Sequence, residues 1–91
     1  MDKIIKFREN IDFIDNNILV LLKERFEIVK KIKEIKIKNK IEILDKEREN
    51  NIYDNIYNNF KEYYIYFKPI YEIILKESKI YQSNKIKITD L

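Results

Sequence analysis

The three arginines are the residues of this chain best suited to binding an anion. Of its 19 cationic side chains, sixteen are lysines and only Arg8, Arg25 and Arg48 are arginines. Arginine presents a planar fork that grips a carboxylate or a phosphate through two parallel hydrogen bonds, whereas the lysine ammonium is a point charge. Because the composition favours lysine so strongly, we expect each arginine to do what lysine cannot. The alternative is that three arginines remain by chance.

Two cations fall at interior positions of the first helical pattern. Arg25 continues a seam of apolar residues that passes through Leu21, and Lys36 follows eleven residues later, about 20° around the same helix. Burying an unpaired charge costs several kcal/mol, so both side chains need a partner. They indicate an interior space for an anion, unless Arg25 pairs with Glu24 or Glu49 and Lys36 reaches back to the surface.

The segment after residue 44 repeats this arrangement. Asp45, Arg48 and Glu49 are spaced by three and four residues and lead into Ile52 and Ile56. This spacing places all five side chains on one face of a helix, the face that turns toward the core.

The last third of the chain does the same with Ser78 and Gln82, which lie four and eight residues after Ile74. Each polar residue taken singly is typical of a cap or a solvated surface. Three segments that all place polar groups at interior positions instead indicate a polar cavity for an anionic guest inside a helical bundle.

A heptad seam predicts one long helix over residues 3–38. It ends at 38–40, where Asn39 suits the left-handed cap position that glycine usually takes. The seam consists of Ile4, Phe7, Ile11, Ile14, Ile18, Leu21, Ile28, Ile32 and Ile35, with a second stripe of Leu22, Phe26 and Val29.

Two shorter helices complete a predicted all-α fold. One begins after Asp45, a good N-cap residue, and ends at 58 or 59. The other covers 66–83, with Pro69 in its first turn, where a missing N–H does no harm. We expect residues 84–91 to form a loosely ordered tail. The apolar side of the third helix consists of Ile70, Ile73, Ile74 and Tyr81.

The length of the first helix predicts a second copy of the chain. About 35 residues span about 52 Å, and two short helices cannot cover such a seam. An antiparallel pair of long helices, with the short ones wrapped around it, solves this problem. Arg8 lies 17 residues before Arg25, or about 25 Å along the axis, so we expect it to complete the partner's cavity. An ordinary coiled-coil dimer is the alternative.

Composition excludes several kinds of protein. The 91 residues make one domain, placed at 1–83, and include no Cys, His or Gly. There is therefore no disulfide framework, no thiolate nucleophile, no histidine to act as a base or metal ligand, and no glycine-rich phosphate loop. We expect neither metal nor cofactor. The longest apolar run, residues 18–22, is far too short for a membrane span, and the N-terminus lacks a signal-peptide core. We therefore expect a cytoplasmic protein without membrane contacts.

The polar residues described above, in this order, resemble those of the all-α chorismate mutases over about residues 4–83. The resemblance implies an interlocked antiparallel homodimer of three-helix protomers with shared active sites. It also implies conversion of chorismate to prephenate, toward phenylalanine and tyrosine, without a cofactor. The residues that carry it are Arg8, Arg25, Lys36, Asp45, Arg48, Glu49, Ser78 and Gln82.

The resemblance also implies roles for these side chains. Arg25 and the partner's Arg8 would clamp the two substrate carboxylates, with Ser78 assisting at one of them. Lys36 and Gln82 would donate hydrogen bonds to the ether oxygen of the breaking C–O bond.

The second helix would handle the substrate ring. Glu49 would accept a hydrogen bond from the ring hydroxyl, with the Asp45 backbone nearby, and Arg48 would lie beside the ring.

Three other interpretations remain open from the sequence. An isochorismate–pyruvate lyase on the same fold would use a similar pocket. A non-catalytic helical dimer explains the heptads but not the inward polar residues. Nucleic-acid binding has sixteen lysines in its favour, but they are interleaved with sixteen acidic residues, which is typical of a solvated face.

Overall fold

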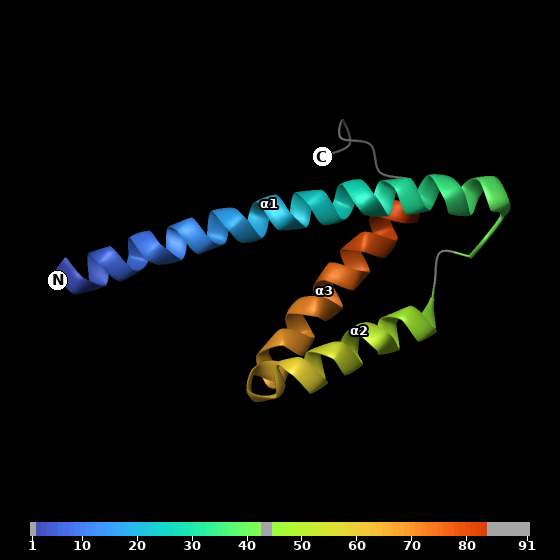
Figure 1. Ribbon diagram of the computed structural model, residues 1–91. Helices are drawn as coiled ribbons and strands as arrows, with labels where there is room; N and C mark the ends of the chain where they lie inside the picture. Colours follow the sequence, from blue (N-terminus) through green and yellow to red (C-terminus); the bar gives the residue numbers. More distant parts are fainter. Residues whose placement is uncertain (1, 43–44, 84–91) are drawn as a thin grey trace.

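The computed structural model describes residues 2–42 and 45–83, and all regular secondary structure within them is helical (Figure 1). The helices are α1 (Asp2–Asn39), α2 (Lys46–Asn59) and α3 (Tyr64–Ser83), with a short 3-10 helix, η1 (Lys61–Tyr63), before α3. The predicted all-α class with one long N-terminal helix is confirmed. The predicted tail, 84–91, lies outside the described residues.

The end of α1 is closed by two backbone hydrogen bonds. The N–H of Ile41 donates to the carbonyl of Lys36 at 2.8 Å, and the N–H of Lys40 donates to that of Ile37 at 3.3 Å. We expected Asn39 to take the left-handed position at the end of this helix. Lys40 takes it instead, with a φ of 56°. The helix continues through Asn39, and the two bonds offset the cost of about 1–2 kcal/mol that a left-handed lysine carries.

The start of α2 agrees with the sequence. Asp45 has extended backbone angles, and its Oδ1 accepts a hydrogen bond of 2.9 Å from the N–H of Arg48. This N-cap satisfies one of the donors that every helix start leaves free.

The start of α3 does not agree with the sequence. The helix begins at Tyr64, so Pro69 is inside it and beyond its first turn. Aromatic side chains explain the earlier start, because they pack the beginning of α3 against the end of α2. Tyr57 meets Tyr64 with ring centroids 5.4 Å apart, and Phe60 meets Phe67 at 5.8 Å, both edge to face. Such pairs stabilise by about 0.5–1.5 kcal/mol each beyond their burial.

α3 lies between the other two helices and packs against both (Figure 1). On α1 it meets the predicted second stripe, where the rings of Phe26 and Tyr81 are 5.2 Å apart. The buried core is small and consists of Val29, Ile56 and Leu75.

Of the predicted apolar side of α3, Ile74 is half-buried and Tyr81 packs on α1, but the other two residues do not pack in the protomer. Ile70 and Ile73 are 53% and 62% exposed, while Leu75 and Ser78 are buried. α3 contacts α1 on one side and α2 on the other. Its packed face therefore lies between these two contacts and includes Leu75 and Ser78.

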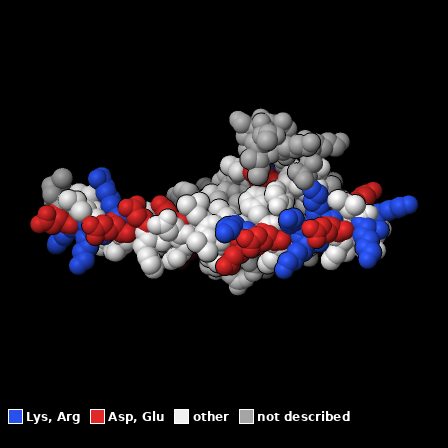
Figure 2. All heavy atoms as spheres, turned by 90° about the horizontal axis from the view of Figure 1, so that it is seen from above, with Lys and Arg blue, Asp and Glu red and all other residues white. Residues whose placement is uncertain are grey.

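The N-terminal half of α1 extends beyond α2 and α3 (Figure 1). Figure 2 shows acidic and basic side chains interleaved toward both ends of α1, with an uncharged stretch between them, residues 16–22. No helix among the described residues is long and apolar enough to span a membrane. Every residue of the predicted heptad seam is exposed by 42–63% in the protomer.

Candidate active site

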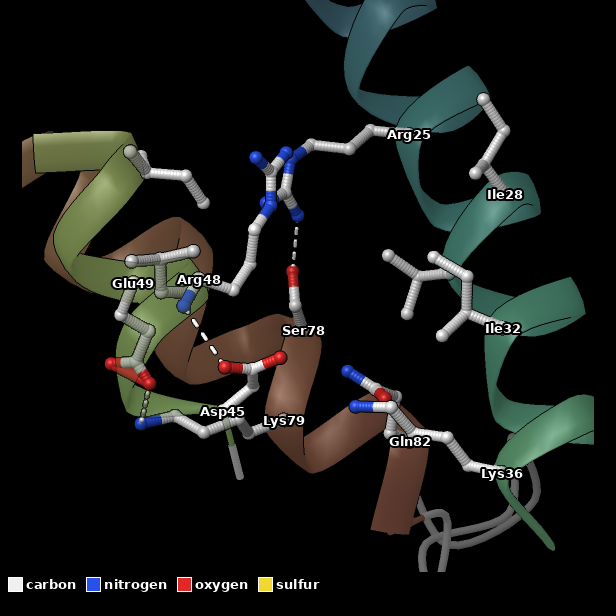
Figure 3. Close-up of a pocket in the computed structure, with 13 residues that line it drawn as sticks. Arg25, Ile28, Ile32, Lys36, Asp45, Arg48, Glu49, Ser78, Lys79 and Gln82 are labelled. Atoms are coloured by element: carbon white, nitrogen blue, oxygen red, sulfur yellow. Dashed lines mark hydrogen bonds and ion pairs between the residues drawn. The ribbon is translucent and has the colours of Figure 1, made fainter. Parts of the chain in front are cut away.

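The three helices surround a pocket of about 360 Å³ (Figure 3). Seven of the eight polar residues singled out from the sequence line it, while its apolar wall includes Val29 and Leu75. Long-range packing thus brings together residues up to 57 positions apart in the chain. The seven are Arg25 and Lys36 of α1, Asp45, Arg48 and Glu49 at the start of α2, and Ser78 and Gln82 of α3.

Arg25 is held by a neutral partner. Its Nη1 donates a short hydrogen bond to the hydroxyl of Ser78, which is 4% exposed and itself donates to the carbonyl of Ile74 at 2.7 Å. Among the described residues no carboxylate pairs with Arg25, so Glu24 and Glu49 do not neutralise it. Its charge is positioned by Ser78 and remains for a guest.

Arg48 lines the same pocket as Arg25. Figure 3 shows both guanidinium groups pointing into the space between the helices, one from α1 and one from α2. Two like charges in one space repel each other, and an anion between or beside them relieves that repulsion. This end of the pocket is therefore suited to a carboxylate.

Lys36 and Gln82 form the opposite end. Both side chains are half-buried and line the pocket, and Figure 3 shows them extending from α1 and α3. The Gln82 amide oxygen is buried and accepts no hydrogen bond from the described residues. An orphaned buried acceptor costs about 1–3 kcal/mol, so this amide marks a position for a hydrogen-bonding guest.

Two carboxylates complete the lining and have different surroundings. Asp45 is exposed and caps α2 through Oδ1. The side chain of Glu49 is 17% exposed, and its Oε2 lies 3.5 Å from Nζ of Lys79. Glu49 also affects the nearby Tyr53. Burial raises the pKa of the Tyr53 hydroxyl above its ordinary value, and the charges of Glu72 and Glu49, together with Tyr64, raise it further.

Lys79 is a pocket residue that the sequence reasoning missed. Leu75, Ser78, Lys79 and Gln82 recur at intervals typical of one helix face. Steps of four residues from Ile74 reach Ser78 and Gln82 but pass over Leu75 and Lys79. With Lys79 included, four cations and two carboxylates line the pocket, which complements a guest of two negative charges.

Arg8 is the one predicted residue that the protomer does not bring to the pocket. It is exposed on the projecting half of α1, about 25 Å along the axis from Arg25. No group of three or more His, Cys, Asp or Glu residues in the described part of the chain is arranged to hold a metal.

The pocket residues are suited to binding a dianion. It offers paired guanidinium forks at one end, an ammonium and an amide at the other, and a carboxylate at the side. Such fixed donors can hold a flexible dianion in one conformation and stabilise negative charge that develops on one of its oxygens.

Comparison with known proteins identifies the relatives of this chain. The sequence profile of the family described as chorismate mutase type II matches residues 7–83. The chorismate mutase of Methanocaldococcus jannaschii is 36% identical over 92 residues, which cover 98% of this chain and 93% of that protein.

Two longer relatives contain a matching region. The bifunctional chorismate mutase/prephenate dehydratase of Aquifex aeolicus is 42% identical over 64 residues, 70% of this chain and 18% of that protein. Its namesake in Buchnera aphidicola is 35% identical over 82 residues, 87% of this chain and 21% of that protein. This chain therefore matches about a fifth of each. No solved structure matches significantly.

Proposed function

The chain belongs to the chorismate mutase type II family, and we propose that it converts chorismate to prephenate in the pocket between α1, α2 and α3. The observation that carries this proposal is the convergence of Arg25, Lys36 and Gln82 on one pocket that is rich in cations. Prephenate leads toward phenylalanine and tyrosine, and two of the relatives join this activity to a prephenate dehydratase.

The reaction requires the enzyme to position the substrate and does not require a nucleophile. It is a pericyclic rearrangement within one molecule, in which a C–O bond breaks and a C–C bond forms. The enzyme must hold the flexible substrate in the compact conformer that brings the two reacting carbons together. Arg25 would grip one carboxylate, with Ser78 fixing the guanidinium, and Arg8 of the partner subunit would grip the other.

The ether oxygen becomes negative as the C–O bond breaks. Lys36 and Gln82 both line the pocket (Figure 3) and would donate hydrogen bonds to this oxygen. Donors that are fixed before the reaction stabilise the transition state without a cost of reorganisation. The Gln82 amide must turn its NH₂ group toward the oxygen for this role, which a rotation of the amide plane provides.

The start of α2 would bind the ring. Glu49 would accept a hydrogen bond from the ring hydroxyl, near the backbone of Asp45, and Arg48 would lie beside the ring. Because Asp45 and Glu49 are the two carboxylates of the lining and Asp45 caps the helix, Glu49 is the better acceptor.

A second copy of the chain would complete each pocket. The seam of α1 is exposed in the protomer, and residues 16–22 carry no charge on any side of the helix. A helix that is uncharged and mainly apolar all round is usually buried on all sides. We therefore place the crossing of two antiparallel α1 helices at this stretch.

This crossing predicts the register of the dimer. Its centre is close to Leu19, and Arg8 lies eleven residues before it. In an antiparallel pair Arg8 then lies opposite residues about eleven positions after the centre on the other chain. That position falls between Val29 and Ile32, which line the pocket.

An assay of the purified protein with chorismate tests the proposal. We expect chorismate absorbance to fall while prephenate accumulates. Lys36→Met should lose most of this activity, and Lys38→Met is the matched control, since Lys38 is an exposed lysine of the same helix outside the pocket. Salicylate formed from isochorismate, without prephenate from chorismate, would instead indicate an isochorismate–pyruvate lyase.

A further inference from the structure

Lys79 is a pocket cation with an acidic partner on another helix. Its Nζ lies 3.5 Å from Oε2 of Glu49, and it reaches that carboxylate from α3 across to α2 (Figure 3). The Lys79 side chain is 40% exposed and that of Glu49 is 17% exposed, so the pair lies where the pocket meets solvent.

The position of this pair matters because Glu49 is the acceptor that the proposed function assigns to the ring hydroxyl. A free glutamate side chain samples several rotamers, and each must be given up when it binds a ligand. Lys79 removes part of that freedom in advance by holding one carboxylate oxygen. An ionised carboxylate accepts at both oxygens, so the second oxygen stays available to the substrate.

We propose that Lys79 is a positioning residue for Glu49 and thereby for recognition of the ring hydroxyl, an inference that rests on the proposed function. Lys79 acts through Glu49 and does not grip a substrate carboxylate itself. Ion pairs of this exposure add little to the stability of a fold, so removing Lys79 should affect catalysis while leaving the protein folded.

The test compares two ligands, chorismate and an analogue, and two lysines of α3. Lys79→Met removes the charge and keeps an unbranched apolar stem, and Lys76→Met is the control, because Lys76 is exposed one turn earlier and outside the pocket. kcat/KM is measured with chorismate, and binding is measured with a chorismate analogue that lacks the ring hydroxyl. Thermal unfolding of both variants verifies that they are folded.

For Lys79→Met we expect kcat/KM on chorismate to fall roughly 3- to 10-fold, the scale of one partly exposed charged hydrogen bond. Affinity for the analogue without the hydroxyl should stay as in the wild type, and Lys76→Met should change neither. Lys79→Arg should recover part of the loss, since it restores a cation beside Glu49. An equal loss of kcat/KM and of analogue affinity would overturn the proposal, because Lys79 would then act on a substrate carboxylate.

A double-mutant cycle gives an independent readout. In the Glu49→Gln background, adding Lys79→Met should have little further effect on kcat/KM, because the residue acts through the glutamate. Full additivity of the two losses would contradict this route. The proposed function fails if the wild-type chain forms no prephenate. The role of Lys79 fails if the wild type is active and the variants do not behave as described, so the two failures are distinguishable.

Discussion

At the scale of single residues, Arg25 shows why a side chain that looks misplaced in a sequence points to function. Its guanidinium is fixed by the buried Ser78 and by no carboxylate among the described residues. A lysine at this position keeps the charge but loses the planar fork that binds a carboxylate through two bonds.

We predict that Arg25→Lys lowers kcat/KM on chorismate by about 2–4 kcal/mol of transition-state stabilisation, the scale of a lost buried charged pair. Steady-state kinetics on the purified variant measure this loss. Activity close to that of the wild type would contradict the clamp role of Arg25.

Tyr53 provides a second prediction at this scale, on stability. Burial, with Glu72 and Glu49 nearby, raises the pKa of Tyr53 above 10.0, its value in the unfolded chain. As the pH rises past 10, the unfolded chain releases this proton before the folded chain does. The free energy of unfolding therefore falls with rising pH, and Tyr53→Phe should escape this part of the loss.

Urea denaturation at a fixed protein concentration between pH 8 and about 11 checks this expectation. The difference in unfolding free energy between Tyr53→Phe and the wild type should change in favour of the variant above pH 10. Two curves that stay parallel over the whole range would contradict it.

At the scale of helices, the start of α2 agrees with the sequence, while the end of α1 and the start of α3 differ from it. The cap at Asp45 is visible in the sequence, because a cap depends on residues that are three positions apart. The start of α3 before Pro69 depends on Tyr57 of α2 and on Phe60, which caps that helix, and no local pattern reports such contacts. The left-handed Lys40 follows from where α1 ends, and helix ends are uncertain by one or two residues in any sequence pattern.

The cap itself gives a prediction for α2. Asp45→Ala removes the acceptor for the Arg48 N–H and should lower the free energy of unfolding by about 0.5–2 kcal/mol. Asp45→Asn keeps a side-chain oxygen and should lose much less. Urea denaturation of both variants distinguishes the loss of the cap from the loss of the negative charge, which both variants share.

The site was more predictable than the boundaries of α3. Helical spacing placed Arg25 and Lys36 on one face, and it placed the polar residues at the start of α2 on another, so their convergence needed only the right packing. Lys79 escaped notice because its significance lies in a contact with Glu49, 30 residues away. Such a pairing exists only in the folded chain.

At the scale of the whole molecule, the protomer leaves its longest helix largely uncovered. The exposed seam of α1 and its uncharged middle would be costly in water, and an antiparallel second copy would bury both. The same pairing would bring Arg8, which the protomer leaves far from its own pocket, to the pocket of the partner. On this account the chain must form the dimer in order to have a complete active site.

The most direct measurement of this central claim mixes two inactive variants. Arg8→Ala and Arg25→Ala chains, unfolded together in equal amounts and refolded, should form mixed dimers in which one of the two pockets has both arginines. We predict that the mixture recovers about a quarter of the wild-type mutase activity per chain, as random pairing requires. A refolded, dimeric mixture that stays as inactive as either parent would contradict the shared active site.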